Sequence, residues 1–360
     1  MIGLPTAAPE LVVTNFHRRF TGVSATADAV VSQQRNLFQL CLAGRPLPSA
    51  PQAVTYRQAL SLCRQPPPGR PFAIWHVRRN SEMLAAIIAR DVLRLPIRIV
   101  FTSAAQRLHS AFPRRLIAKM DAVVATTAKA AAFVPNLAGI IPHGVDTERF
   151  VPAADRQAAW DKLGYGGRYG IGIVGRVRPE KGTDLFVESL LRVLPQRPEF
   201  TAVIIGRAMP GDREFQRRLQ QRIEAAGLTD RFVFAGELPP QEMPVLMRSL
   251  SLLVAPARYE GYGMTPLEAM ASGVAVVASE TGVYPEIVQD AVGRLVPIGD
   301  VEALSHAVAE VTQDVDRLHR MGLAARELAE SHLSLRLESA GYASLMQRMW
   351  AGESVSVLPL

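Results

Sequence analysis

Apolar residues along the chain gather in short runs, and longer segments with helical spacing separate these runs. The runs occupy 10–16, 37–42, 72–76, 97–102, 121–125 and 140–142, then 169–174, 200–205, 232–235, 252–255 and 275–278. Helical patterns lie between them, notably at 51–63 and 81–93, and a helical tail runs from Asp300 to Trp350. Strands that alternate with helices over a whole chain are typical of α/β proteins with parallel sheets.

Length and composition favour a two-domain globular protein. The chain has 360 residues, more than one hydrophobic core usually supports, and 48% of them are hydrophobic. Two cysteines, Cys41 and Cys63, provide no disulfide framework, so we expect a reducing compartment. No apolar run reaches the length of a membrane span, and no basic region precedes an apolar one at the N-terminus. We therefore expect a soluble or peripheral protein that is not secreted.

Charge is distributed unevenly between the two halves. Residues 1–155 hold 18 Lys and Arg against 8 Asp and Glu, a net +10, whereas the remainder holds 22 against 25, a net −3. A basic half indicates contact with an anionic surface, either nucleic acid or lipid headgroups, although an Arg-rich proteome would give the same count. The stretch 110–120, with Arg114, Arg115 and Lys119, is amphipathic and basic. It is either an interfacial segment or a helix packed on the sheet with a solvated face.

A hydrophobic run, a glycine-rich turn and a helix follow one another around residue 260. The helix is predicted to begin at Pro266, so the N–H groups of 263–265 should point at one spot that suits an anion. Glu260 lies before the turn and Glu268 in the first helical turn, so both carboxylates would flank one pocket for hydroxyls and phosphate. Alternatively, Glu260 is a solvated loop residue and Glu268 interacts only with the helix dipole.

This stretch resembles the E-x7-E signature of the retaining GT-B glycosyltransferases, glycosyltransferase family 4 in particular. The resemblance implies that Glu260 meets the hydroxyls of a donor sugar and that Glu268 holds the ribose diol. The backbone between them would meet sugar and phosphate. The residues implied there are Gly261, Tyr262, Gly263, Met264 and Thr265.

The segment 175–182, Gly-Arg-Val-Arg-Pro-Glu-Lys-Gly, follows a predicted strand and resembles the family's Gly-Arg-x-x-x-Glu-Lys-Gly. By that resemblance Arg176 and Lys181 clamp the donor diphosphate, whose negative charge grows as the glycosidic bond breaks. A solvated basic loop is the alternative. Just upstream, Gly170-Ile-Gly-Ile-Val-Gly175 fits the dinucleotide fingerprint G-x-G-x-x-G, but it lies inside a strand run, so we reject that interpretation.

Two sites in the first half complete the candidate set. Gly22 lies in a turn before a helix predicted to open at about Thr26, and the resemblance makes it the glycine that faces the donor phosphate. An ordinary turn glycine is the alternative. His76 ends a predicted strand beside Arg78, where ligands of α/β sheets lie, and the resemblance implies contact with the donor sugar and the reacting centre. A structural histidine is the alternative there, and His109 is a less well placed rival.

The resemblance also implies the architecture. Ile141-Pro-His-Gly-Val-Asp-Thr-Glu-Arg-Phe150 is similar to the family's stretch between two domains, with His143 where Asn is commoner. The expected fold is therefore α/β of the GT-B type, two Rossmann-like domains facing across a cleft. We assign 1–150 to an acceptor-binding domain, 151–333 to a nucleotide-sugar-binding domain and 334–360 to a helix that crosses back to the first.

Stretches beginning at Thr14, Ile74 and Val100 look similar to bacterial lipopolysaccharide core mannosyltransferases that use GDP-mannose. The implied reaction is retaining hexosyl transfer from this nucleotide sugar to a lipid-linked anionic glycan, without metal or other cofactor. The implied place is the cytoplasmic face of the inner membrane, with peripheral contact through the basic first domain. The predicted catalytic residues are His76, Arg176, Lys181 and Glu260.

Several alternatives remain open. Asp314-Val-Asp316 matches a metal-binding Asp-x-Asp, but it sits in the helical tail and is interpreted as surface helix. Within the same family, another sugar nucleotide or a soluble acceptor is possible. A nucleic-acid-binding protein is the alternative from another class, against which the 6% of aromatic residues and the lack of a recognised motif count. An inactive GT-B protein is disfavoured because both glutamates and both cations are present.

Overall fold

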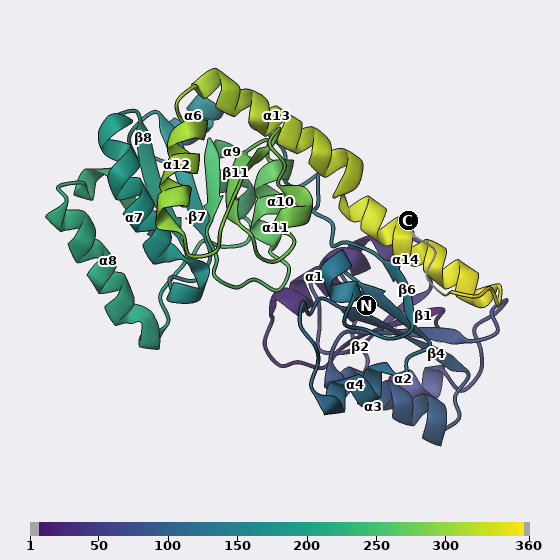
Figure 1. The fold of residues 1–360 in the computed structure, drawn as a ribbon. Helices are drawn as coiled ribbons and strands as arrows, with labels where there is room; N and C mark the ends of the chain where they lie inside the picture. Colours follow the sequence, from purple (N-terminus) through teal and green to yellow (C-terminus); the bar gives the residue numbers. More distant parts are fainter. Residues whose placement is uncertain (1–6, 356–360) are drawn as a thin grey trace. The chain divides into compact units, whose positions relative to one another are not determined.

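The structure, a computed structural model, describes residues 7–355. The chain forms two compact units (Figure 1). The N-terminal unit extends to Gly144 and also contains the chain from Leu335 onwards, and the C-terminal unit is Val145–Ser334. The domain boundaries predicted at 150 and 333 lie near the two positions, after Gly144 and after Ser334, where the chain passes from one unit to the other. Within residues 7–355, no helix combines the length and apolar character needed to cross a bilayer.

The N-terminal unit is built on a six-stranded parallel sheet in the order β2-β1-β3-β4-β5-β6. Its strands are β1 (Leu11–Asn15), β2 (Leu40–Gly44), β3 (Ala73–Val77), β4 (Ile97–Ser103), β5 (Ala122–Ala125) and β6 (Leu137–Ile140). Its helices are α1 (Gly22–Gln34), α2 (Tyr56–Leu62), α3 (Asn80–Ile87) with the π-helical η1 (Ile88–Val92), α4 (Ala111–Ile117), α5 (Ala128–Ala131) and α14 (Leu335–Trp350).

Both faces of this sheet are covered, which explains why its strands are continuous apolar runs. One core cluster joins the sheet to α1 and α14 and includes Val30, Tyr342 and Met346. The other joins the sheet to α2, α3 and α4 and includes Met83 and Ile117. The last helix of the chain therefore belongs to the N-terminal unit.

The C-terminal unit has a second six-stranded parallel sheet, in the order β12-β11-β10-β7-β8-β9. Its strands are β7 (Tyr169–Val174), β8 (Phe200–Ile205), β9 (Phe232–Gly236), β10 (Leu252–Ala255), β11 (Ala275–Ser279) and β12 (Gly293–Val296). Its α-helices are α6 (Arg156–Asp161), α7 (Thr183–Val193), α8 (Arg213–Ala225), α9 (Met243–Ser249), α10 (Met264–Ala271), α11 (Tyr284–Ile287), α12 (Val301–Val311) and α13 (Val315–His332). Short 3-10 turns complete it: η2 (Pro179–Lys181), η3 (Leu194–Gln196), η4 (Pro210–Asp212) and η5 (Thr229–Arg231).

Some element boundaries differ from the sequence predictions. The helix expected to open at Pro266 begins at Met264, and the one expected at about Thr26 begins at Gly22. The helical tail is three helices, because Asp314 caps a new helix by accepting from the Arg317 N–H. The strand predicted at 140–142 ends earlier, at Ile140, and β12 was not predicted.

Two glycines of the rejected dinucleotide fingerprint, Gly170 and Gly172, lie inside β7, and the third, Gly175, follows directly after it. A Cβ added to Gly170 would come within 2.2 Å of the Trp160 ring, and one added to Gly172 within 2.5 Å of Leu250. These glycines therefore make room for packing and are not available to hold a dinucleotide.

In each sheet the order in which successive strands are added reverses at one strand. In the C-terminal unit β7 lies between β10 and β8, and in the N-terminal unit β1 lies between β2 and β3. Ligands of open α/β sheets bind beyond the carboxyl ends of the strands at such a switch point. We therefore expect ligands at the loops that follow β7 and β10, and at those that follow β1 and β3.

Candidate active site

In the C-terminal unit the loops after β7 and β10 touch each other. Gly182 ends the β7 loop with φ +71°, and a Cβ there would lie 2.0 Å from the Pro256 carbonyl oxygen, so only glycine fits. Arg258 holds the same two loops together, since its guanidinium donates to both carboxylate oxygens of Asp184 at 2.8 and 2.7 Å. Its backbone N–H also donates to the Glu180 carbonyl at 2.9 Å.

Two predicted site residues meet between these loops. The Lys181 ammonium forms an ion pair with Glu260 Oε2, and both side chains are largely buried. Glu260 Oε1 accepts from the Gly261 N–H at 3.2 Å, so the carboxylate also orders the start of the glycine turn. Sequence positions 79 residues apart are thus joined at the switch point.

Arg176 follows β7 and is exposed. It lines a cavity of ≈ 230 Å³ whose other walls come from the ends of β8 and β9. Arg207 and Glu237 lie in that wall and form an exposed ion pair, with Nε 2.7 Å from Oε2. A cation beside a cavity at a strand end is suited to a phosphate and the group attached to it.

The glycine turn has a conformation that only glycine accepts. Gly263 has φ +97° and caps α10, and a Cβ at this position would lie 2.4 Å from the Tyr284 ring. The buried Tyr284 also hydrogen-bonds Thr265 through its hydroxyl. Tyr262 is buried in the core, so only its backbone is available to a ligand, and Met264 and Thr265 are half-buried.

Glu268 lies in the second turn of α10, not in the first, because the helix begins two residues earlier than predicted. Its side chain keeps some exposure, but desolvation raises the pKa of the carboxyl to about 7, against a smaller opposing effect of Arg149. A carboxyl that titrates near neutrality can accept hydrogen bonds from a diol once it is ionised.

Three residues that support this site were missed by the sequence analysis: Arg258, Thr281 and Tyr284. Thr281 Oγ1 accepts from the Glu260 N–H at 3.2 Å, and the Val283 N–H donates to the Tyr262 carbonyl at 2.9 Å. The segment after β11 therefore holds the glycine turn from one side. The partners are far apart in sequence, and no local pattern marks them.

In the N-terminal unit Gly22 is the first residue of α1 and is exposed. A Cβ at this position would meet nothing within 4 Å, so packing inside the unit does not require glycine. This is compatible with the predicted close approach of a phosphate, which stays a prediction.

His76 lies near the carboxyl end of β3, beside Arg78, as predicted. Its side chain is fully buried, with Nε2 2.7 Å from Thr102 Oγ1 and Nδ1 3.4 Å from an Arg78 Nη2 that can only donate. Burial and the neighbouring Arg78 cation lower the pKa of His76 well below the usual range, so the ring is neutral. This environment fits the alternative of a structural histidine, and contact of His76 with a donor sugar stays a prediction. His109, the rival, is half-buried and lies 3.2 Å from Ser103 Oγ.

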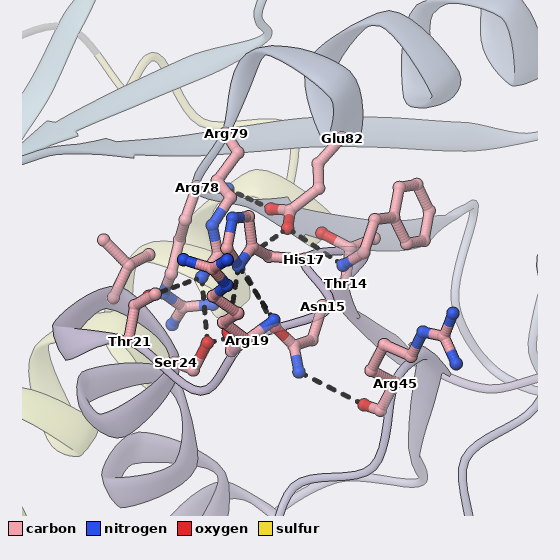
Figure 2. A network of polar contacts seen from close by, with 12 residues as sticks. Thr14, Asn15, His17, Arg19, Thr21, Ser24, Arg45, Arg78, Arg79 and Glu82 are labelled. Carbon is pink, nitrogen blue, oxygen red and sulfur yellow. Dashed lines mark hydrogen bonds and ion pairs between the residues drawn. The ribbon is translucent and has the colours of Figure 1, made fainter.

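A polar network around Arg79 and the buried Glu82 joins β1, β3, α1 and α3 in the same unit (Figure 2). Arg79 donates to Asn15 Oδ1 at 3.2 Å, to Thr21 Oγ1 at 3.1 Å and to Ser24 Oγ at 2.9 Å. Glu82 pairs with Arg79 at 2.9 Å and accepts from two backbone N–H groups, those of residues 16 and 78. The loops after β1 and β3 are therefore held together by one polar network.

Comparison with known proteins agrees with these motifs. The family described as "Glycosyl transferases group 1" matches residues 156–328. The chain is 42% identical over 351 residues, 94% of this chain and 98% of the other, to the lipopolysaccharide core biosynthesis mannosyltransferase LpsB of Rhizobium meliloti (strain 1021). It is also 42% identical over 307 residues, 85% of this chain and 86% of the other, to the lipopolysaccharide core biosynthesis mannosyltransferase LpcC of Rhizobium leguminosarum bv. viciae.

Solved structures agree on the fold. Anabaena Alr3699/HepE in complex with UDP aligns with 94% of this chain and 99% of its own at a TM-score of 0.80, with 16% sequence identity. The C-terminal domain of a glycosyl transferase group 1 family protein (LpcC) from Francisella tularensis is 36% identical and covers 53% of this chain and 99% of its own, at a TM-score of 0.52. The expected GT-B fold, with two Rossmann-like domains, is confirmed. The chain belongs to the group 1 glycosyltransferases, the family that the sequence motifs predicted.

Proposed function

We propose that this protein transfers mannose from GDP-mannose to a lipopolysaccharide core acceptor with retention of configuration. The observation that carries the proposal is the Lys181–Glu260 pair beside Arg176 at the switch point, in a chain 42% identical to lipopolysaccharide core mannosyltransferases. Cations for a diphosphate and a carboxylate for sugar hydroxyls are there within one set of loops.

The chemistry follows from these groups. The bond between the anomeric carbon and the diphosphate oxygen breaks, a bond to the acceptor oxygen forms on the same face, and the acceptor proton passes to the departing diphosphate. Arg176 and Lys181 stabilise the charge that develops on the leaving group. Donor phosphate would replace Glu260 as the partner of Lys181, which frees the carboxylate for the sugar. We propose that no metal ion takes part.

The cavity beside Arg176 supports guanine as the base. Guanine presents N1–H and an exocyclic amino group side by side, and a single carboxylate can accept from both, whereas uracil presents one N–H between two carbonyls. Glu237 supplies a carboxylate in the cavity wall, and its present partner Arg207 is exposed and exchanges readily with water.

The acceptor is proposed to be a lipid-linked anionic glycan, reached from the cytoplasmic face of the inner membrane. The charge of the first 155 residues, +10, supports an acidic partner. Exposed apolar side chains accompany it: Leu84, Ile88 and Val92 recur every four residues along α3 and η1, and Phe112 of α4 is 56% exposed. A basic surface with exposed apolar groups is suited to an anionic lipid interface.

A donor panel tests the proposal. GDP-mannose, GDP-glucose, UDP-glucose and ADP-glucose are compared by thermal shift and by transfer to a deacylated core oligosaccharide, and the anomer is read by NMR. GDP-mannose should give the largest shift and an α-linked product, and saturating EDTA should leave the rate unchanged. Preference for a UDP or ADP donor would overturn the donor assignment. A β-linked product would overturn retention, and loss of activity on chelation that manganese or magnesium restores would overturn metal independence.

A further inference from the structure

The loop after β1, residues 16–20, presents basic and aromatic side chains to solvent. Four consecutive residues of this β1 loop, 17–20, are exposed, and Phe20 exposes 61% of its surface. Among residues 7–355, no carboxylate forms an ion pair with Arg18 or Arg19. Two uncompensated guanidinium groups and an unburied ring are an unusual tip for a loop that serves only to connect two elements.

Both ends of the β1 loop are fixed (Figure 2). At its start, the backbone N–H of Phe16 donates to Glu82 at 3.2 Å, and the Asn15 side chain binds Arg79. Just beyond its end, Thr21 accepts from Arg79 at 3.1 Å. The His17 ring closes the turn internally against the backbone of Arg19. A tip on a fixed base loses little entropy when it binds a ligand.

Neighbouring loops at the same sheet edge are basic as well. The loop after β2 contributes Arg45, whose backbone is held by Asn15, and the loop after β4 contributes Arg107. The segments 16–21, 44–50, 78–82 and 104–110 contain one carboxylate, that of Glu82, and it is fully buried and paired. The carboxyl edge of β2, β1, β3 and β4 therefore presents cations to solvent without exposed carboxylates between them.

We infer that the β1 loop binds the acidic group of the acceptor glycan, with Arg18 and Arg19 pairing to a carboxylate or phosphate of the sugar and Phe20 stacking on an apolar sugar face. Guanidinium groups bind carboxylate and phosphate with directed hydrogen bonds, and an exposed ring offers a flat apolar surface beside them. This rests on the proposed function, because it assigns the acceptor of that reaction. The pair Arg79–Glu82 acts as a positioning pair, since it fixes the loop without facing the ligand.

The test uses the full chain and a deacylated lipopolysaccharide core oligosaccharide in three forms: untreated, with its sugar-acid carboxyl reduced to an alcohol, and with phosphate removed by phosphatase. The variant Arg18→Gln/Arg19→Gln is compared with the parent and with Arg64→Gln/Arg94→Gln. The control removes the same charge from exposed positions that precede β3 and β4, at the opposite edge of the sheet. KM, kcat and calorimetric acceptor affinity without donor are measured.

Loss of the two guanidinium groups should raise KM for the untreated acceptor about tenfold or more, with kcat and GDP-mannose affinity unchanged. For the parent, KM should rise by the same factor on the acceptor form that lacks the recognised anion. On that form the variant and the parent should have equal KM. If the carboxyl-reduced form gives this pattern, the recognised group is a carboxylate. If the phosphatase-treated form gives it, the recognised group is a phosphate. The control should match the parent throughout.

Equal affinity of variant and parent for the untreated acceptor would overturn the inference. So would an equal loss on all three forms, because the loop would then not recognise an anion of the acceptor. The calorimetric arm requires no transfer, so it remains decisive for the loop even if the parent proves inactive with GDP-mannose and the proposed function fails.

Discussion

Lys181 and Glu260 compensate each other's charge in the absence of a donor, whereas Arg176 is exposed. Either cation, once removed, should reduce kcat/KM about a hundredfold, the scale of losing one group that stabilises developing charge. The two variants should differ in stability, because Lys181→Ala leaves a largely buried carboxylate without its partner and Arg176→Ala does not. Steady-state kinetics and thermal melts of both test this, with the exposed Lys162→Ala as control. Parental rates in both variants would contradict the phosphate assignment.

The Glu268 carboxyl gives the enzyme a pH dependence whose sign can be stated. Its folded pKa of about 7 lies above its ordinary value, so between roughly pH 4.5 and 7 the folded protein keeps a proton that the unfolded chain has released. The stability that Glu268 contributes therefore falls as pH rises through this window. As pH rises from 5 to 8, the free energy of unfolding of Glu268→Gln should increase relative to that of the parent by about 1–2 kcal/mol in denaturant titrations, after allowance for residual exposure. An unchanged difference across this range would contradict the raised pKa.

Donor binding should depend on the same proton in the opposite direction. In the proposed site an ionised Glu268 would accept from both ribose hydroxyls, so the affinity for GDP-mannose should rise several-fold from pH 6 to pH 8. Glu268→Gln should bind weakly without this dependence. Glu260→Gln should lower kcat but keep nucleotide affinity, because Glu260 is assigned to the sugar. Calorimetry with GDP and GDP-mannose separates these roles, and loss of GDP affinity in Glu260→Gln would show that they are wrong.

The sequence predicted which residues of the candidate site lie on neighbouring loops, but it did not predict the environments of their side chains. The motif around Glu260 and the cations of the β7 loop could be predicted, since local spacing encodes them. The burial of His76 could not, because Thr102 and Arg78 enclose it only in the folded unit. The role of Tyr284 could not be predicted for the same reason, because its contact with Gly263 joins separate elements.

At the scale of elements, the glycine turn and α10 pack against Tyr284, the first residue of α11. Gly263→Ala should destabilise the protein by about 2 kcal/mol or more, because φ +97° disfavours a side chain and the added Cβ would collide with Tyr284. Gly261→Ala is the matched control, since a Cβ there meets nothing within 4 Å. This second variant should fold normally. Denaturant melts compare the two, and equal stability would mean that the turn adapts.

Element boundaries were predicted accurately where the signal for them lies in the local sequence. β7, β8 and β10 were predicted to the residue because they are almost continuous apolar runs bounded by polar or turn-forming residues. β12 was missed because it is short, contains Arg294 and pairs only at the sheet edge. The start of α10 was misplaced because Pro266 was read as the first helical position, where proline is common, although it is the third.

At the scale of the whole chain, alternation of strands and helices was enough to predict two parallel α/β units. Charge asymmetry added a functional expectation that the fold alone does not contain. The structure now distinguishes two parts of that charge: cations at the carboxyl edge of the N-terminal sheet, and those on α4, whose Leu116 and Ile117 are buried while Arg114 and Arg115 face solvent. The stretch 110–120 thus contains a short helix, α4, that packs on its unit, and its exposed face is basic.

That exposed face should bind anionic membranes. Replacement of Arg114, Arg115 and Lys119 by Gln should weaken binding to vesicles of anionic lipid by about a hundredfold at low salt, at roughly 1 kcal/mol per charge near the surface. Binding by the parent should fall as salt rises, because exposed charges are screened over about 10 Å at 0.1 M. A residual, salt-resistant component should depend on Phe112, which is 56% exposed, and should be lost in Phe112→Ser.

Vesicle sedimentation measures this prediction, with transfer to a deacylated acceptor in parallel. The control replaces Arg213, Arg217 and Arg218 of α8, which removes the same charge from exposed positions of the other unit. It should bind vesicles like the parent, and both triple variants should keep activity on the soluble acceptor, because neither surface belongs to the proposed site. Equal binding of the parent to neutral and anionic vesicles would contradict a basic membrane face. Tighter binding to RNA than to vesicles would instead revive the nucleic-acid alternative, since the same guanidinium groups would then be serving phosphates of another polymer.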